Sequence, residues 1–107
     1  MELPELVARF VEAQNSLDSK TYVECFTDSA IVHDEGKTHT GKAEIQQWIE
    51  DANAKYQSFM KPLSYEQFGA DAVLEAEVSG TFPGSPAVLQ FHLGLKDELI
   101  EALKVTG

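Results

Sequence analysis

The chain has 107 residues, and its 18 Asp and Glu outweigh its 8 Lys and Arg, which gives a formal net charge of -10 at pH 7. This length suits a single domain, residues 1–107, and the acidic balance disfavours nucleic acid and anionic membrane surfaces as partners. The single cysteine excludes an intrachain disulfide and a cysteine-based zinc site. The sequence shows no targeting segment and no apolar run of membrane-spanning length, so we expect a cytoplasmic protein.

The amino-terminal quarter of the chain is predicted to form two helices. Apolar residues between Leu3 and Leu17 fall largely on one stripe, at spacings of three and four. Asp18 or Ser19 can cap a short second helix that runs to about Phe26.

A short hairpin and a third helix follow. Residues 30–34 are predicted as a strand, 35–37 as a turn and 38–40 as the partner strand. The next helix is the clearest in the sequence, because its apolar residues repeat at spacings of three and four. These residues are Ile45, Trp48, Ile49, Ala52 and Tyr56.

The second half of the chain alternates with period two, which predicts four strands. The first, 59–68, is less regular because Pro62 removes a ladder donor. The others are expected near 72–79, 87–95 and 99–105. This order predicts an α+β domain in which three helices pack against one face of a curved antiparallel sheet.

The opposite face of that sheet is predicted to be mixed in polarity. Such a face suits half-coverage by a second copy of the chain, so we expect a homodimer formed through the sheet. The residues of this face are Val73, Glu75, Glu77, Val88, Gln90, His92, Ile100 and Ala102.

Several short motifs between Leu6 and Ile49 keep a characteristic order. They are Arg9-Phe10-Val11, Asn15 with Asp18, Phe26-Thr27-Asp28-Ser29-Ala30, Val32-His33-Asp34-Glu35-Gly36 and Gly41-Lys42-Ala43-Glu44-Ile45. In these motifs the chain resembles the nuclear transport factor 2-like superfamily, and within it the SnoaL-like and ketosteroid isomerase-like groups. The resemblance implies a cone-shaped, cystatin-like domain, usually dimeric through its sheet, with a pocket between helices and sheet. Family members are isomerases, dehydratases, polyketide cyclases, or binding and assembly domains, and the fold does not select among these.

Asp34 is the candidate general base, because the resemblance aligns it with the catalytic carboxylate of the isomerases in this superfamily. The residue pattern gives an independent argument, since Ala30, Val32 and Asp34 share strand parity. A carboxylate that lines an apolar cone is desolvated, which raises its pKa and suits it to take a proton from carbon beside a carbonyl. The alternative is an exposed turn aspartate, because Asp34-Glu35-Gly36 also suits a hairpin tip.

The sequence departs from the isomerase pattern at the two groups that donate hydrogen bonds to the enolate oxygen. Phe10 stands where those enzymes have a tyrosine, and Leu89 where they have a protonated aspartate. Loss of one such donor typically costs about a hundredfold or more, so ketosteroid isomerisation by that mechanism is disfavoured. Substitute donors could be Tyr22, Tyr56, Trp48 or Tyr65.

The histidines are interpreted mainly as surface or interface residues. His33 neighbours Asp34 and should point to the opposite side of the strand. A metal site formed by His33, Glu35 and His39 is a minor alternative, since this spacing is not a recognised zinc signature. His92 is expected in the contact between two sheets.

Two functions therefore stay open. One is a cofactor-independent isomerase, cyclase or lyase that acts on a small hydrophobic molecule with Asp34 as base. The other is a non-catalytic homodimeric module that binds a ligand or a protein, or serves as an assembly domain. Neither a metal nor a cofactor is expected. The residues predicted to line the pocket are Phe10, Tyr22, Phe26, Trp48, Tyr56, Leu89 and Phe91.

Overall fold

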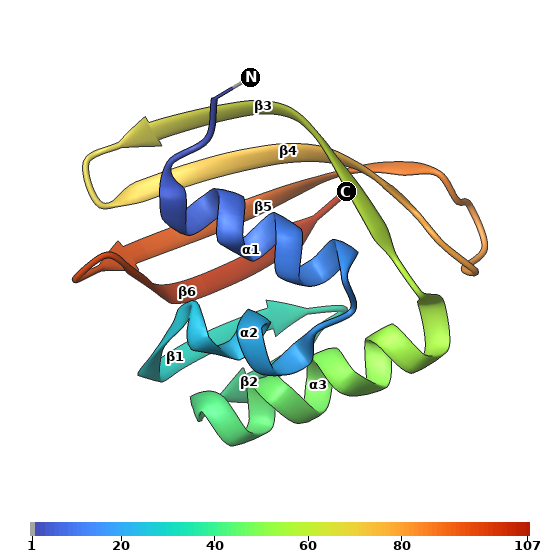
Figure 1. Ribbon diagram of the computed structural model, residues 1–107, viewed down its shortest axis with the longest axis horizontal. Helices are drawn as coiled ribbons and strands as arrows, with labels where there is room; N and C mark the ends of the chain where they lie inside the picture. The colour runs from blue at the N-terminus through green and yellow to red at the C-terminus, as the bar shows by residue number, and fades with distance from the viewer. Residues whose placement is uncertain (1) are drawn as a thin grey trace.

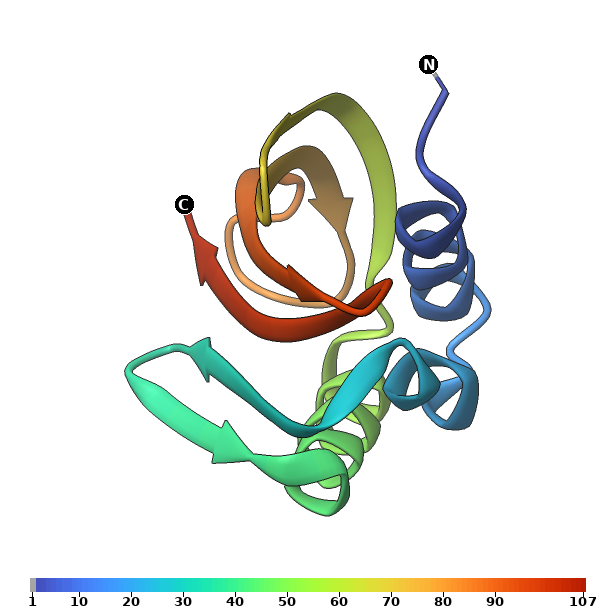
Figure 2. The same ribbon diagram turned by 90° about the vertical axis from the view of Figure 1, so that its left-hand side faces the viewer.

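The structure is a computed structural model that describes residues 2–107, and these residues form an α+β domain, as the sequence predicted (Figure 1). The helices cover one side of a strongly curved sheet, which Figure 2 shows from its end. Along the chain the elements are α1 (Glu5–Asn15), α2 (Ser19–Glu24), β1 (Phe26–Asp34), β2 (Lys37–Thr40), α3 (Gly41–Tyr56), β3 (Phe59–Phe68), β4 (Asp71–Ser79), β5 (Ala87–Lys96) and β6 (Leu99–Thr106).

Local hydrogen bonds fix the helix boundaries. Of the two candidate caps for α2, Asp18 takes the role, because its Oδ1 accepts a hydrogen bond from the Thr21 N–H at 3.1 Å. Glu44, in the first turn of α3, accepts a hydrogen bond from the Thr40 N–H at 2.9 Å. At the other end of α3, Gln57 adopts a left-handed conformation with φ 50°, which stops the helix before β3. Among residues 2–107, none of the helices combines the length and the apolar character that crossing a bilayer requires.

The strands form one sheet in the order β2-β1-β6-β5-β4-β3. Neighbouring strands are antiparallel except β1 and β6, which run parallel. The sheet is therefore mixed rather than purely antiparallel as expected, because periodicity along the chain identifies strands but not their partners. This pairing also explains why β1 begins at Phe26, four residues before the predicted start: Phe26 is in register with Ile100, and an irregularity follows before Ile31 pairs with Ala102.

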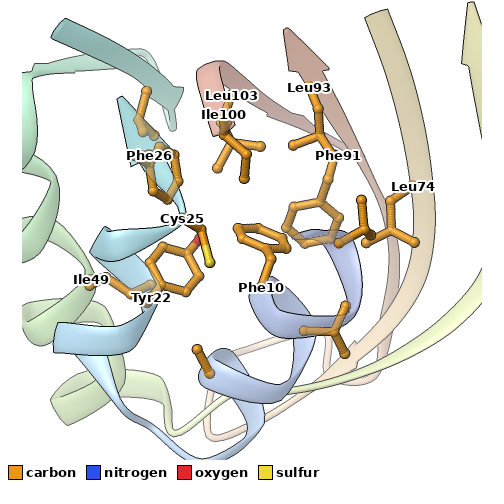
Figure 3. Packing of buried hydrophobic residues seen from close by; sticks show 14 of the residues in the cluster. Phe10, Tyr22, Cys25, Phe26, Ile49, Leu74, Phe91, Leu93, Ile100 and Leu103 are labelled. Atoms are coloured by element: carbon orange, nitrogen blue, oxygen red, sulfur yellow. The ribbon is translucent and has the colours of Figure 1, made fainter. Parts of the chain in front are cut away.

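The hydrophobic core lies between the helices and the inner face of the sheet (Figure 3). Aromatic rings from α1, α2, β1 and β5 meet there. The ring centroid of Phe10 lies 4.9 Å from that of Tyr22 and 6.3 Å from those of Phe26 and Phe91. Such tilted and edge-on contacts add to the burial of large apolar surfaces, so this cluster stabilises the attachment of α1 to the sheet.

The outer sheet face differs from the prediction at one residue. Seven of its eight predicted members are exposed or half-buried, but Ile100 is fully buried in the core. The β5–β6 register is irregular between Gly94 and Leu95, and Ile100 pairs with Leu95 whereas Ala102 pairs with Gly94. Such a bulge reverses the side-chain parity of a strand, so alternation counted from the end of β6 places Ile100 on the wrong face.

Candidate functional site

A cavity of about 590 Å³ opens between α2, α3 and the inner face of the sheet. This volume lies in the range that small-molecule sites occupy. Its wall is largely apolar and comes from all three helices and from β3, β4, β5 and β6, with Asp34 and Glu35 at the end of the β1–β2 hairpin.

Five of the residues predicted to line a pocket line this cavity, namely Tyr22, Trp48, Tyr56, Leu89 and Phe91. The other two, Phe10 and Phe26, do not. Both are fully buried behind the cavity, because neighbouring rings of the aromatic cluster and Ile100 enclose them. They belong to the packed core rather than to the cavity wall. Phe10 of α1, which stands where the resemblance implies a tyrosine donor, is thus a core residue.

Asp34 ends β1 on the same face as the buried residues Ala30 and Val32, so its side chain is half-buried on the cavity wall. The turn consists of Glu35 and Gly36, one step beyond it. The indole Nε1 of Trp48 donates a hydrogen bond to Asp34 Oδ2 at 3.3 Å. Burial raises the pKa of the Asp34 carboxyl, and the negative charge of Glu35 adds to this rise. The hydrogen bond from Trp48 and the nearby His39 act in the opposite direction.

His39 takes a position that sequence reasoning missed. The β1–β2 register pairs His39 with Val32 and His33 with Thr38, so the two imidazoles lie on opposite faces of the hairpin. His39 stacks on the indole of Trp48, with centroids 5.6 Å apart and ring planes 28° apart. His33 is exposed, as predicted, and its Nδ1 lies 3.2 Å from Thr38 Oγ1.

The alternative of a metal site at this hairpin therefore lacks the convergence it needs. Because strand alternation separates His33 from His39, the three side chains do not meet. Within residues 2–107, no group of three or more His, Cys, Asp and Glu side chains is arranged to hold a metal ion.

Tyr22 places a phenol in the cavity wall. The residue is 2% exposed, and burial raises the pKa of its phenol well above the usual range, with smaller contributions from Cys25 and Asp34. Its hydroxyl has no hydrogen-bond partner among residues 2–107. Every fully buried polar side-chain atom of these residues has a partner, so the Tyr22 hydroxyl reaches the cavity. The raised pKa keeps this hydroxyl protonated, so it can donate a hydrogen bond.

A buried amide pair closes the cavity at the far end of α3. Gln14 Nε2 donates to Asn53 Oδ1 at 3.1 Å and to the Ser58 carbonyl at 3.3 Å. Gln14 and Ser58 also line the cavity. The sequence carried a signal for this pair, because Gln14 and Asn53 are amides on helix stripes whose other members are apolar. In such a position an amide needs a buried partner.

The sheet curvature, the three helices and the cavity between them together define a nuclear transport factor 2-like fold. A protein of this fold from Cytophaga hutchinsonii superposes with a TM-score of 0.81 at 15% identity, covering 99% of this chain and 91% of the other. A Catenulispora acidiphila protein with a ketosteroid isomerase-like fold gives a TM-score of 0.88 at 19% identity, with 99% and 87% covered. At these identities the likeness concerns the fold alone.

Within this fold class, the model of the SnoaL-like domain family matches residues 7–100, so the chain belongs to that family. A Sinorhizobium meliloti protein that carries the name polyketide cyclase is 34% identical, with a TM-score of 0.93 over 97% of this chain and 95% of the other. No match was found among curated proteins.

Proposed function

We propose that this SnoaL-like protein binds a small apolar carbonyl compound in the cavity and that Asp34 removes a proton from the carbon beside the carbonyl. The observation that carries the proposal is a half-buried carboxylate on the wall of a largely apolar cavity. Desolvation raises the pKa of Asp34 and so makes its carboxylate a stronger base than an exposed aspartate.

Trp48 and Tyr22 supply the two further groups that this chemistry needs. The indole of Trp48 orients the carboxylate through the hydrogen bond to Oδ2, and His39 stacks on a face of the same indole. When the C–H proton moves to Asp34, the electron pair of that bond moves onto the carbonyl oxygen and forms an enolate. The Tyr22 hydroxyl can donate a hydrogen bond to this oxygen, which makes α2 rather than α1 the source of the donor.

The enolate can then react in one of two ways within the same cavity. Return of the proton from Asp34 to another carbon of the conjugated system gives an isomerisation. Attack of the enolate carbon on a second carbonyl carbon of the same molecule closes a ring. The π electron pair of that carbonyl moves to its oxygen, which takes the proton from Asp34, and the reaction is a cyclisation. Neither reaction consumes an oxidant or a reductant. The likeness to a protein named polyketide cyclase supports the second.

The test is hydrogen exchange of β-tetralone, a small apolar ketone, in heavy water, followed by proton NMR. We expect the protein to accelerate exchange of the protons beside the carbonyl. Asp34→Asn should reduce this acceleration by roughly a hundredfold to ten-thousandfold, the usual contribution of a general base. Asp51→Asn is the matched control, because Asp51 is exposed on α3 and accepts a hydrogen bond only from Gln47 in the same helix. Equal acceleration by the wild type and Asp34→Asn would refute the role of Asp34.

A second candidate function is a binding module without turnover. Leu89 favours it, because an aliphatic side chain lines the cavity at the position where the resemblance implies a second donor. In this case β-tetralone binds with similar affinity to the wild type and Asp34→Asn, and neither accelerates exchange. The same two proteins thus separate the candidates.

We also propose that two copies associate through the outer face of β4, β5 and β6. Strand register supports this, because it aligns His33, Lys104 and His92 in one row and places Glu75 and Glu77 in neighbouring rows. A second copy in the reverse orientation could set His92 against these carboxylates. Light scattering should give twice the monomer mass, and a monomer at micromolar concentration would refute the dimer.

A further inference from the structure

A second hollow adjoins the cavity where β1 and β6 separate. Their parallel pairing ends at His33 and Lys104. From there β1 turns away at Glu35–Gly36, whereas β6 continues along β5 to Thr106, and Figure 2 shows the two segments diverging. A groove of about 420 Å³ lies at this divergence.

The groove differs from the cavity in chemistry, because two lysines and a histidine line it. Lys37 reaches it from β2 on the sheet face of Asp34, whereas Lys104 and His33 reach it from β6 and β1 on the opposite face, so the groove is bordered by a lysine from each face where the two strands part. Neither lysine forms an ion pair with a carboxylate of residues 2–107, whereas Arg9 and Lys42 each have an acidic partner. Two of the chain's 8 basic residues therefore border one groove without a carboxylate partner.

The groove and the cavity are neighbours, because Asp34, Glu35 and Val105 line both and so lie between them. A molecule that extends from one to the other would pass Asp34, with its apolar part against the rings of the cavity and its other end beside Lys37 and Lys104. Asp34 and Glu35 are the carboxylates that line the groove, at its border with the cavity.

We propose that the ligand of this protein is an apolar molecule with one anionic group, and that Lys37 and Lys104 bind this group in the groove while the apolar part occupies the cavity. The inference rests on the proposed function in that it uses the same cavity, and it adds the charge and the orientation of the ligand. A carboxylate, a sulfonate and a phosphate share the required chemistry, because each accepts charge-assisted hydrogen bonds from an ammonium group.

Two naphthalene dyes with the same ring skeleton test the proposal by fluorescence titration. Anilinonaphthalene sulfonate carries one negative charge, and N-phenylnaphthylamine is its neutral counterpart. We expect Lys37→Gln and Lys104→Gln each to weaken binding of the sulfonate by roughly threefold to tenfold, the effect of one partly exposed charged contact. Binding of the neutral dye should not change. Lys61→Gln on β3 is the control, because it removes the same charge from an exposed site outside both hollows.

The location of the dyes is checked with Ala52→Phe, which adds a ring to the cavity wall from α3. We expect this variant to weaken both dyes, with thermal unfolding as the control for folding. Suppose that the neutral dye binds and responds to Ala52→Phe, but the sulfonate binds all the lysine variants with the wild-type affinity. The proposed binding of an anionic group by the lysines is then refuted, whereas ligand binding in the apolar cavity is supported. If neither dye binds the wild type, the ligand-binding cavity of the proposed function is refuted as well.

Discussion

The space between the helices and the sheet is packed solid at one end and open at the other. At the closed end Phe10, Phe26 and Ile100 are fully buried, and their atoms fill the interior between α1, β1 and β6. At the open end Trp48, Tyr56 and Leu89 are only half-buried and surround the cavity. The same architecture thus has a closed end that contributes stability and an open end that leaves apolar surface and a carboxylate facing the cavity.

The largest effect on stability is expected from removing a buried aromatic ring at the closed end. Phe10→Ala should lower the free energy of unfolding by about 3–5 kcal/mol, because it removes a fully enclosed ring and leaves a void between α1 and the sheet. Leu89→Ala, at the open end, should cost about 1 kcal/mol, since its side chain already faces open space. Urea unfolding measures both. Equal losses would show that the two ends contribute alike to stability.

An intermediate effect is expected from Tyr22→Phe, which removes only the hydroxyl that faces the cavity. The rate of β-tetralone exchange should fall about a hundredfold, the typical cost of one donor to an enolate oxygen. The melting temperature should stay the same, because the hydroxyl bonds to no other residue of 2–107. Tyr65→Phe is the control, since that phenol donates to Gln67 Oε1 at 2.9 Å, outside the cavity. Unchanged exchange in Tyr22→Phe would exclude its hydroxyl as the donor.

The smallest expected effect is the loss of stability that results from half-burying the Asp34 carboxylate on the cavity wall. Burial and Glu35 raise the pKa of Asp34 above its ordinary value of 3.8, so the folded protein retains this proton to a higher pH than the unfolded chain does. Stability is therefore lost as the pH rises from the unfolded pKa through the folded pKa. Asp34→Asn should melt higher than the wild type at neutral pH, and the gain should vanish well below pH 3.8. A lower melting temperature for Asp34→Asn at neutral pH would contradict this sign, and Asp51→Asn controls for loss of charge.

Local patterns in the sequence predicted the elements of the fold well. The apolar spacing of α3 from Ile45 to Tyr56 and the alternation of β4 and β5 appear in the structure as expected. Both depend on near neighbours in the chain, whose geometry is set by the helical and strand repeats. The parallel pairing of β1 with β6 was missed because it joins residues more than 70 positions apart, which leave no mark in local periodicity.

The candidate site was only partly predictable for the same reason. The face of Asp34 followed from its parity with Ala30 and Val32, and it lies on the cavity wall. Parity could not tell which aromatic side chains line the cavity and which fill the core, so Phe10 and Phe26 were grouped with Tyr22. Strand parity also could not predict that His39 stacks on Trp48, because this contact joins a β-hairpin to the middle of a helix.

By itself, the sequence determined which segments become helices and strands and, in a strand without a bulge such as β4, which side turns inward, because these properties are set over a few residues by backbone geometry and apolar repeats. Only the tertiary structure decided which part of the space between helices and sheet is filled by side chains and which part is a cavity. Whether a buried side chain meets another side chain or open space depends on how distant segments pack, on the bulge that turns Ile100 inward, and on where β1 parts from β6. The cavity, the groove beside it and the partners of Asp34 all follow from that packing.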